Sequence, residues 1–339
     1  MKQPTIYDVA KEAGVAISTV SKVLNNTGSI GANTRKKVED TMQRLNYQPS
    51  VAASVKKRIQ TIGLLIPNIA DPFMAEIART IEDYGRNHGF SLMICSTDNN
   101  LEKEMEYVSI LKQKYIDGII VATGLKNTKA LKTLLNNDIP VALLAREVPS
   151  LDLNTVVVND FLGAYEATSY LIELGHQTIA MVTEDIYFPV TRARLDGYKQ
   201  ALEQAGICYD DGLVSLNNTT FTDAKDSTVE LLKLPHPPTA IFASTEPLAI
   251  GAMKGARELK LDIPKDISIV GFDNSILANM CYPELTTVSQ PIKEMGEKVV
   301  ELLVEEMKEP KKLKQRIVMS PELVIRGTAT EISIPSTKK

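Results

Sequence analysis

From Thr61 onward, short apolar runs alternate with longer amphipathic stretches, and this alternation limits the possible folds more than any other feature of the chain. Apolar runs bounded by polar or turn residues predict buried strands, and the stretches between them have the spacing of amphipathic helices. The predicted strands lie at residues 62–66, 92–95, 118–122, 141–144, 156–158, 179–182, 240–243 and 267–272. The predicted helices lie at residues 74–88, 101–114, 127–137, 161–174, 190–205, 222–233, 247–259 and 291–308.

Strands that are apolar throughout and separated by helices are typical of βαβ units, in which both faces of a parallel sheet are covered. The predicted strands are too many for one small doubly wound sheet. The sequence therefore predicts two parallel sheets with a cleft between them. In folds of this kind, ligands bind at the carboxyl ends of the strands.

The bulk composition is that of an ordinary soluble globular protein, large enough for two or three domains. The chain has 339 residues, of which 44% are hydrophobic and 24% are charged. No apolar run reaches the roughly 18 residues that a membrane span requires, and no secretory signal is visible at the N-terminus. We therefore expect a cytoplasmic protein with no membrane partner.

The few cysteines and histidines argue against a disulfide framework and against a zinc site. The cysteines are isolated and odd in number, which favours buried thiols in a reducing cytoplasm; they are Cys95, Cys208 and Cys281. The histidines are too far apart in sequence for zinc-ligand spacing; they are His88, His176 and His236. We predict no metal and no cofactor.

Charge is distributed unevenly along the chain. Residues 1–60 contain ten Lys or Arg and four Asp or Glu, a net charge of +6, and because the formal total is −4, residues 61–339 carry −10. A basic N-terminal segment on an acidic remainder predicts that the N-terminal segment meets a polyanion and that the remainder does not.

The stretch from Thr5 to Asn26 has the pattern of two short helices joined by a tight turn. Thr5 and Asp8 form the T-x-x-D pattern of a capping box, and Gly14 stands where a left-handed C-cap would end the first helix. The second helix, from about Ile17 to Leu24, exposes an isoleucine and hydroxyls beside a lysine. This suits a recognition helix in a DNA major groove. The alternative is a helical hairpin that merely packs on the domain behind it, because helix-turn-helix patterns are weakly specific.

A third helix, from about Asn33 to Leu45, completes a three-helix N-terminal domain. Its N-terminus holds Thr34, Arg35 and Lys36, a setting in which phosphate binds well. Residues 49–60 are rich in small residues and basic at their end, so they are either a plain linker or a hinge helix that forms only on DNA. The tail, residues 331–339, is polar and is expected to be flexible.

Many short motifs occur here in the order in which one protein family has them. They are Tyr7-Asp8-Val9-Ala10, Gly14-Val15, Ser18-Thr19-Val20-Ser21-Lys22-Val23-Leu24-Asn25, Tyr47-Gln48-Pro49, Thr61-Ile62-Gly63-Leu64-Leu65-Ile66-Pro67, Asp71-Pro72-Phe73, Asp117-Gly118-Ile119-Ile120, Leu174-Gly175-His176, Arg194-Leu195-Asp196-Gly197-Tyr198, Val270-Gly271-Phe272-Asp273-Asn274 and Pro283-Glu284-Leu285-Thr286-Thr287-Val288. Through these motifs, and over nearly its whole length, the chain resembles the lactose/galactose repressor family of bacterial transcription factors.

The resemblance implies a domain organisation. An all-α helix-turn-helix head would span residues 1–48, a hinge would span 49–60, and a ligand-binding and dimerisation core would span 61–330. The core would be a periplasmic-binding-protein-like α/β body of two doubly wound parallel-sheet subdomains. The first subdomain would comprise about 61–160 and 291–322, and the second about 161–290 and 323–330. Three crossovers, near residues 160, 290 and 322, would join them.

The resemblance also implies DNA contacts. Three residues of the second helix would read bases, since lysine donates to guanine, serine contacts either base type and isoleucine packs on a thymine methyl; they are Ile17, Ser18 and Lys22. Further residues would contact phosphates, with plain helix-surface polarity as the alternative for Thr19 and Ser21; the set is Thr5, Thr19, Ser21, Asn25 and Thr34. Ala53 and Val55 would enter the minor groove from paired hinge helices. Ala16 replaces the usual serine, which removes a helix cap, and Val55 replaces the usual leucine, which makes a smaller wedge.

A ligand site in the cleft is the third implication. Its candidate residues are Phe73, Arg146, Asp160, Arg194, Phe221, Thr245 and Asp273. The two phenylalanines would stack on a sugar or a base, and the alternative is that they are ordinary core aromatics. Arg146 and Asp160 have a structural salt bridge as their alternative, and Thr245-Glu246 replaces the family's asparagine-aspartate pair. Two arginines facing one cleft favour an anionic ligand, so we expect a sugar acid or sugar phosphate ahead of a neutral sugar.

Together these predictions describe a dimeric repressor of carbohydrate-utilisation genes. Each head would read half of a palindromic operator, and a ligand would change the closure of the two subdomains and so the affinity for DNA. The alternatives are a cytoplasmic sugar-binding protein and a sugar-acting enzyme, each with a helical appendage. No Walker motif, G-x-S-x-G elbow or metal cluster supports an enzyme. Some relatives bind a phosphocarrier protein, but this sequence gives no clear signature of that partner.

Overall fold

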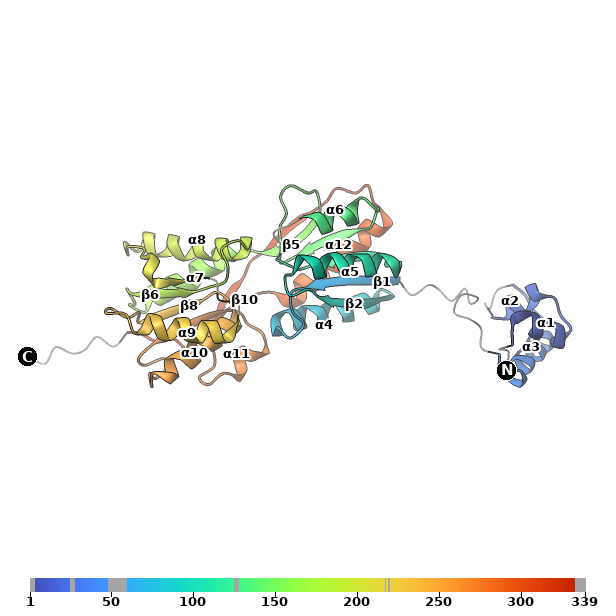
Figure 1. Ribbon diagram of the computed structural model, residues 1–339, viewed down its shortest axis with the longest axis horizontal. Coiled ribbons are helices and arrows are strands. Elements are labelled where there is room, and N and C mark those ends of the chain that lie inside the picture. Colours follow the sequence, from blue (N-terminus) through green and yellow to red (C-terminus); the bar gives the residue numbers. More distant parts are fainter. Residues whose placement is uncertain are drawn as a thin grey trace, which may run out of the picture. The chain divides into compact units, whose positions relative to one another are not determined.

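The structure is a computed structural model that describes residues 4–24, 28–47, 60–124, 128–216, 218 and 220–332. The chain forms two compact units, Met1–Gln60 and Thr61–Lys339. The first unit, the head, is helical, and the second, the body, contains two six-stranded sheets covered by helices (Figure 1). The predicted fold class, a helix-turn-helix head and an α/β body of two parallel-dominated sheets, is confirmed.

The described residues of the head form three helices: α1 (Ile6–Ala13), α2 (Ile17–Leu24) and α3 (Ala32–Arg44). At the start of α1, the Asp8 carboxylate accepts a hydrogen bond from the Thr5 backbone N–H at 2.8 Å, and Gly14 ends the helix with a left-handed φ of 60°. The helices enclose a small core of Val9, Ala10, Ala13, Val20, Val23, Val38 and Tyr47. This core fixes which face of α2 is turned outward.

The first sheet of the body has the strand order β11-β5-β4-β3-β1-β2. Its strands are β1 (Gln60–Ile66), β2 (Phe90–Ser96), β3 (Gly118–Val121), β4 (Val141–Leu144), β5 (Asn154–Val158) and β11 (Arg316–Met319). Its helices are α4 (Pro72–Asn87), α5 (Leu101–Gln113), α6 (Lys129–Leu135) and α12 (Ile292–Lys308). Alternate side chains of a strand point to opposite faces, so Leu64 packs with α4 and α12 whereas Leu65 packs with α5 and α6.

The second sheet has the order β12-β10-β9-β8-β6-β7. Its strands are β6 (Ile179–Val182), β7 (Val214–Ser215), β8 (Ala240–Ala243), β9 (Ser268–Asp273), β10 (Thr286–Ser289) and β12 (Glu322–Val324). Helices α7 (Asp160–Glu173) and α8 (Pro189–Gln204) cover one face. The other face is covered by α9 (Phe221–Leu232), α10 (Glu246–Glu258) and α11 (Ile276–Met280). Every register between neighbouring strands is parallel except that of β10 with β12.

The chain passes between the two sheets three times, from β5 to α7, from β10 to α12 and from β11 to β12. The eight predicted strands correspond to β1–β6, β8 and β9, with small differences at their ends. Four strands escaped prediction because they are short and polar or half-exposed; they are β7, β10, β11 and β12. Of the helices in the part of the chain that the structure describes, none combines the length and apolar character needed to cross a membrane.

Candidate functional site

The outward face of α2 carries the residues predicted to read bases. Val20 and Val23 are buried in the head core, whereas Ile17 is 42% exposed and Ser18 and Lys22 are exposed. Successive helical residues are about 100° apart, so positions 17, 18 and 22 share the face opposite the buried valines. An isoleucine held in solvent beside a hydroxyl and a lysine gives this face both apolar and hydrogen-bonding groups. These are the two kinds of contact that base edges in a major groove accept.

The predicted phosphate contacts that the structure describes are distributed over the three helices of the head. Thr19 and Ser21 are half-buried on α2, and Thr34 lies in the first turn of α3. The Thr5 hydroxyl donates a hydrogen bond to Asp8 at 2.7 Å, so it also stabilises the start of α1. Three predicted contacts lie outside the described residues: Asn25, Ala53 and Val55.

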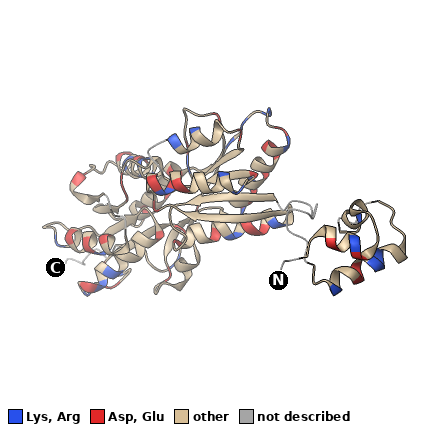
Figure 2. Cartoon of the chain, turned by 45° about the vertical axis from the view of Figure 1, so that its right-hand side comes forward, with Lys and Arg blue, Asp and Glu red and all other residues tan. Residues whose placement is uncertain are grey.

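Basic residues occur on every helix of the head. In Figure 2 they are the blue bands on the head, and they comprise Lys11, Lys22, Arg35, Lys36, Lys37 and Arg44. Arg44 pairs with Glu12 at 3.4 Å. The first turn of α3 contains no acidic residue. Thr34 and Arg35 belong to this turn, and Lys36 follows it directly. A helix N-terminus with its amide groups and two cations is suited to a phosphate oxygen.

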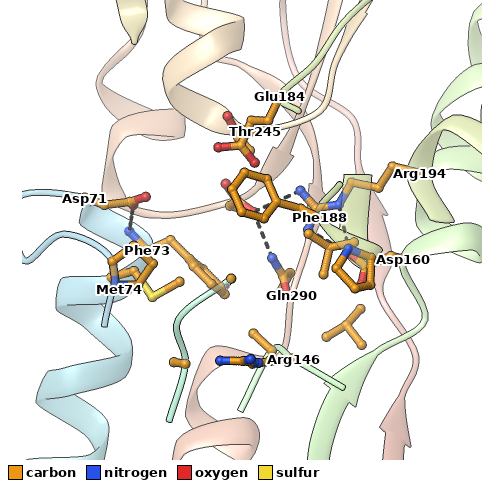
Figure 3. A pocket seen from close by; sticks show the side chains of 18 of the residues that line it. Asp71, Phe73, Met74, Arg146, Asp160, Glu184, Phe188, Arg194, Thr245 and Gln290 are labelled. Carbon is orange, nitrogen blue, oxygen red and sulfur yellow. Dashed lines mark hydrogen bonds and ion pairs between the residues drawn. The ribbon is translucent and has the colours of Figure 1, made fainter. Parts of the chain in front are cut away.

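In the body, a pocket of about 160 Å³ lies where the carboxyl ends of the strands of the two sheets converge (Figure 3). The start of α4 contributes Asp71, Phe73 and Met74 to its lining. The Asp71 carboxylate accepts a hydrogen bond from the Phe73 N–H at 2.9 Å, with Pro72 as the first helical residue. This turn fixes the Phe73 ring at the edge of the pocket.

The predicted pocket residue Arg194 is engaged by groups of its own chain. It is 6% exposed on α8, and its guanidinium lies over the Phe272 ring at 3.7 Å. Its Nε donates to Asp160 Oδ1 at 2.8 Å, one terminal nitrogen lies 2.7 Å from the same carboxylate oxygen, and another terminal nitrogen donates to the Ser244 carbonyl. Asp160 thus forms a buried ion pair with Arg194, and nearby carboxylates raise the pKa of Arg194 against the opposing effect of burial.

Arg146, the other predicted arginine, is also buried and hydrogen-bonded. It donates to the Thr123 carbonyl at 2.8 Å and to the Thr123 hydroxyl at 3.1 Å. The Thr123 hydroxyl donates to the buried carboxylate of Glu104 at 3.0 Å. Burial lowers the pKa of Arg146 and raises that of Glu104, and the attraction between the two charges opposes both shifts.

Asp273 is a buried acid at the end of β9. Gln290 Nε2 donates to its Oδ1 at 2.8 Å, and the Glu246 N–H donates to its Oδ2 at 3.2 Å. Burial raises its pKa to about 8, although Arg194 opposes the shift. The left-handed φ of 107° at this position turns the chain at the end of β9.

These pairings bear on the electrostatic argument for an anionic ligand, which rests on two arginines facing the pocket. Both arginines have partners within the chain, and five carboxylates line the same pocket: Asp71, Glu147, Asp160, Glu184 and Asp273. Burial raises the pKa of Glu184 as well. The pocket therefore holds more acidic than basic side chains, and its carboxyl groups can exchange hydrogen bonds with the hydroxyl groups of a ligand.

One predicted pocket residue is elsewhere. Phe221 is not among the residues that line the pocket, because Thr220 and Asp223 form a capping box that places Phe221 in the first turn of α9. There its ring lies 5.0 Å from Lys254 Nζ. The structure therefore does not bring Phe221 to this pocket, whereas it does bring there the other six predicted residues, Phe73, Arg146, Asp160, Arg194, Thr245 and Asp273.

Sequence reasoning missed several lining residues, among them Asp71, Met74, Asn99, Glu184, Phe188 and Gln290. Asn99 and Glu184 follow predicted strands closely, so the rule that ligands meet strand carboxyl ends was a signal for both. Gln290 follows β10, which was not predicted. Within the described ranges, no group of three or more His, Cys, Asp or Glu side chains is arranged to hold a metal ion.

Comparison with known proteins gives matches over both units. The family described as "Bacterial regulatory proteins, lacI family" matches residues 5–50, and "Periplasmic binding protein-like domain" matches residues 168–329. The HTH-type transcriptional regulator DegA of Bacillus subtilis (strain 168) is 42% identical over 97% of this chain and 99% of its own length.

Two solved structures are similar in fold. The lac repressor dimer bound to operator and the anti-inducer ONPF has a TM-score of 0.82 and 26% identity, covering 97% of this chain and 100% of that one. A LacI family transcriptional regulator from Enterococcus faecium with bound ribose has a TM-score of 0.75 and 31% identity, covering 81% and 100%. The exposed face of α2, the two-sheet body and these matches all point to the same protein family. The chain therefore belongs to the LacI family of bacterial regulatory proteins, which are DNA-binding transcriptional regulators and not enzymes.

Proposed function

We propose that this regulator is a dimeric repressor of carbohydrate-utilisation genes whose binding to a palindromic operator is controlled by a small hydroxyl-rich ligand. In this proposal residues 1–48 bind DNA, residues 49–60 form the hinge, and residues 61–330 bind the ligand and dimerise, with 331–339 as a tail. The main support for the proposal is α2. Its outward face exposes Ile17, Ser18 and Lys22, and its opposite face is buried in the head core through Val20 and Val23.

On the operator, α2 lies in the major groove. Lys22 donates to guanine, Ser18 hydrogen-bonds either base type and Ile17 packs on a thymine methyl. Phosphate contacts come from Thr5, Thr19, Ser21, Asn25 and Thr34, which position the helix without specifying sequence. Ala53 and Val55 enter the minor groove from the hinge.

The effector occupies the pocket of the body. Phe73 and Phe188 belong to different halves of the body and both line the pocket, where aromatic rings can cover the apolar faces of a sugar. The surrounding carboxyl groups and Thr245 exchange hydrogen bonds with its hydroxyls. Arg194 holds Asp160 in place, and Arg146 is itself held by Thr123. A pocket of about 160 Å³ suits a monosaccharide, and the bound ribose of the Enterococcus faecium regulator supports this class of ligand. We therefore place neutral sugars ahead of sugar acids and sugar phosphates.

The dimer forms through the body. Large apolar side chains are exposed on and just after α11. Ile276 and Met280 of α11 are 61% and 71% exposed, and Tyr282 is 89% exposed. Contiguous apolar side chains at the surface are typical of an interface. The similar lac repressor structure is a dimer on its operator, which supports the same assembly here.

The DNA-reading role is tested by Lys22→Ala. Palindromic duplexes are first selected from a randomised pool with the full chain, and affinities are then measured by fluorescence anisotropy. Loss of the Lys22 contact lowers discrimination against a changed guanine by about 1–3 kcal/mol per half-site. Lys11→Ala, which removes the same charge from an exposed site on α1, is the matched control and lowers affinity without changing base preference. An unaltered base preference in Lys22→Ala would contradict the assignment.

The ligand class is tested by calorimetric titration with D-ribose, D-glucose, D-glucuronate and glucose 6-phosphate. Neutral sugars are expected to bind more tightly than the two anions, because Arg146 and Arg194 already have partners within the chain and the pocket holds more acidic than basic side chains. Binding of the phosphorylated sugar with no response to the neutral sugars would reverse this ranking. The sugar that binds is also expected to change the affinity of this protein for its operator.

A further inference from the structure

A close contact joins the two halves of the body across the pocket. Gly124 follows β3 of the first sheet, Phe188 precedes α8 on the second, and both residues line the pocket. A Cβ atom built on Gly124 would lie 2.8 Å from Cδ1 and 2.8 Å from Cε1 of the Phe188 ring. Carbon atoms in contact are about 3.5–4.0 Å apart, so the ring occupies the space that any side chain at position 124 would need.

The backbone on each side of this contact is held by local hydrogen bonds. The Gly124 N–H donates to Asn99 Oδ1 at 2.9 Å. The Phe188 N–H donates to the Asp185 carbonyl at 3.0 Å, and Pro189 follows as the first residue of α8. Figure 3 shows the Phe188 ring among the side chains of the pocket. Because both backbones are anchored in their own half, the ring reaches Gly124 only when the two halves are close together.

A second contact across the same boundary is of a different kind. The Ile276 N–H at the start of α11 donates to Glu76 Oε1 on α4 at 2.8 Å, and this hydrogen bond is exposed. A long glutamate side chain in solvent adjusts to small changes in separation. The Phe188 ring leaves no such freedom, because a Cβ atom at position 124 would lie 2.8 Å from two of its carbon atoms and would have to displace the ring.

We propose that Gly124 is a positioning residue for closure of the body, because only glycine at this position lets the Phe188 ring seat against the opposite wall and cover the pocket. This inference rests on the proposed effector function, for which closure over a ligand is the signal. The φ of Gly124 lies outside the left-handed region, so alanine is compatible with its backbone. The effect of Gly124→Ala therefore comes from the methyl group meeting the ring.

The test measures closure in the full chain without any ligand. Spin labels are placed on Glu102→Cys in α5 and Glu203→Cys in α8, both exposed helical sites in different halves, with Cys208→Ser and Cys281→Ser. Cys95 is buried, and burial raises the pKa of its thiol to about 11, so it stays unlabelled. Pulsed dipolar spectroscopy then gives the distance distribution between the labels. Gly124→Ala is expected to shift this distribution to longer distances.

Two further variants make the result specific. Gly85→Ala on α4, where the new Cβ would lie 3.8 Å from the Phe90 Cβ in ordinary contact, is expected to leave the distribution unchanged. In a Phe188→Ala background, Gly124→Ala is expected to add no further shift, because the ring it would meet is gone. An unchanged distribution in Gly124→Ala overturns the proposal, and so does a shift that persists in the Phe188→Ala background. Since no sugar is present, this outcome is independent of whether the sugar titrations succeed.

Discussion

Asp273 illustrates how burial sets the chemistry of single residues in this pocket. The carboxyl group is buried with Arg194 Nη1 3.9 Å away, while Asp160 is much closer to the same guanidinium. Removing a carboxylate from water favours its protonated form unless a nearby cation compensates. Arg194 lies closer to Asp160 and stabilises its negative charge more than that of Asp273. The effect of burial therefore dominates at Asp273 and raises its pKa to about 8.

This shift predicts that Asp273→Asn gains stability relative to the wild type as pH rises. The folded-state pKa of Asp273 is about 8 against an ordinary 3.8, so the folded chain binds more protons than the unfolded chain between these values. The stabilising effect of the protonated group is complete below pH 4 and is lost as pH rises toward 8, at up to about 1.4 kcal/mol per pH unit. Urea unfolding of both proteins at pH 5 and pH 8 measures the difference. A gap between the variants that is equal at the two pH values would show that Asp273 keeps an ordinary pKa.

At the scale of elements, α8 carries Arg194 and owes its position to close packing against α7. A Cβ on Gly197 would meet the Phe161 carbonyl oxygen and lie 3.0 Å from the Tyr165 nitrogen. The two helix backbones therefore approach to a distance that only glycine permits. Arg194 precedes Gly197 on the same helix, so this packing sets where the guanidinium meets Asp160.

Gly197→Ala is therefore expected to destabilise the body and to move α8 away from α7. The cost of overpacking is typically about 1–3 kcal/mol in the free energy of unfolding, measured by urea denaturation of the full chain. Gly85→Ala is the matched control, because it adds a methyl group to a helix where the nearest contact is an ordinary 3.8 Å. Equal stability of the two variants would mean that α7 and α8 separate without cost.

The sequence predicts some strands and pocket residues and not others. The strands β1, β3, β4, β6 and β8 lie inside their sheets and contain continuous apolar runs, which predict them. The edge strands β7, β11 and β12 pair on one side only and need few apolar residues. Phe73 was placed in the pocket because it follows β1 directly. Phe188 lines the pocket and Phe221 does not, and the sequence pattern does not distinguish them, because the capping of α9 and the turn before α8 decide which ring enters the pocket. The ion pair between Arg194 and Asp160 joins residues 34 apart, and spacing does not reveal such pairs.

At the scale of the whole molecule, the division of charge and the shortness of α2 both bear on how the regulator binds DNA. The head segment carries +6 and the remainder −10, so attraction to phosphates is confined to the heads. A recognition helix of eight residues with three outward side chains contacts few bases. We therefore expect one head to bind weakly and the proposed dimer to bind more tightly, because it would hold two heads at the spacing of two half-sites.

Met280→Asp tests this dependence on the dimer. Met280 is 71% exposed on α11, so the substitution is expected to leave the fold of the body intact while placing a charge in the proposed interface. Sedimentation velocity is expected to show a monomer, and affinity for the palindromic duplex is expected to fall about 100-fold or more, toward the affinity for a single half-site. Leu313→Asp, which adds the same charge at a site that is 88% exposed after α12, is expected to change neither measurement. A Met280→Asp protein that sediments as a dimer and keeps its affinity would place the interface elsewhere, and a monomer that still binds the palindrome tightly would show that one head suffices.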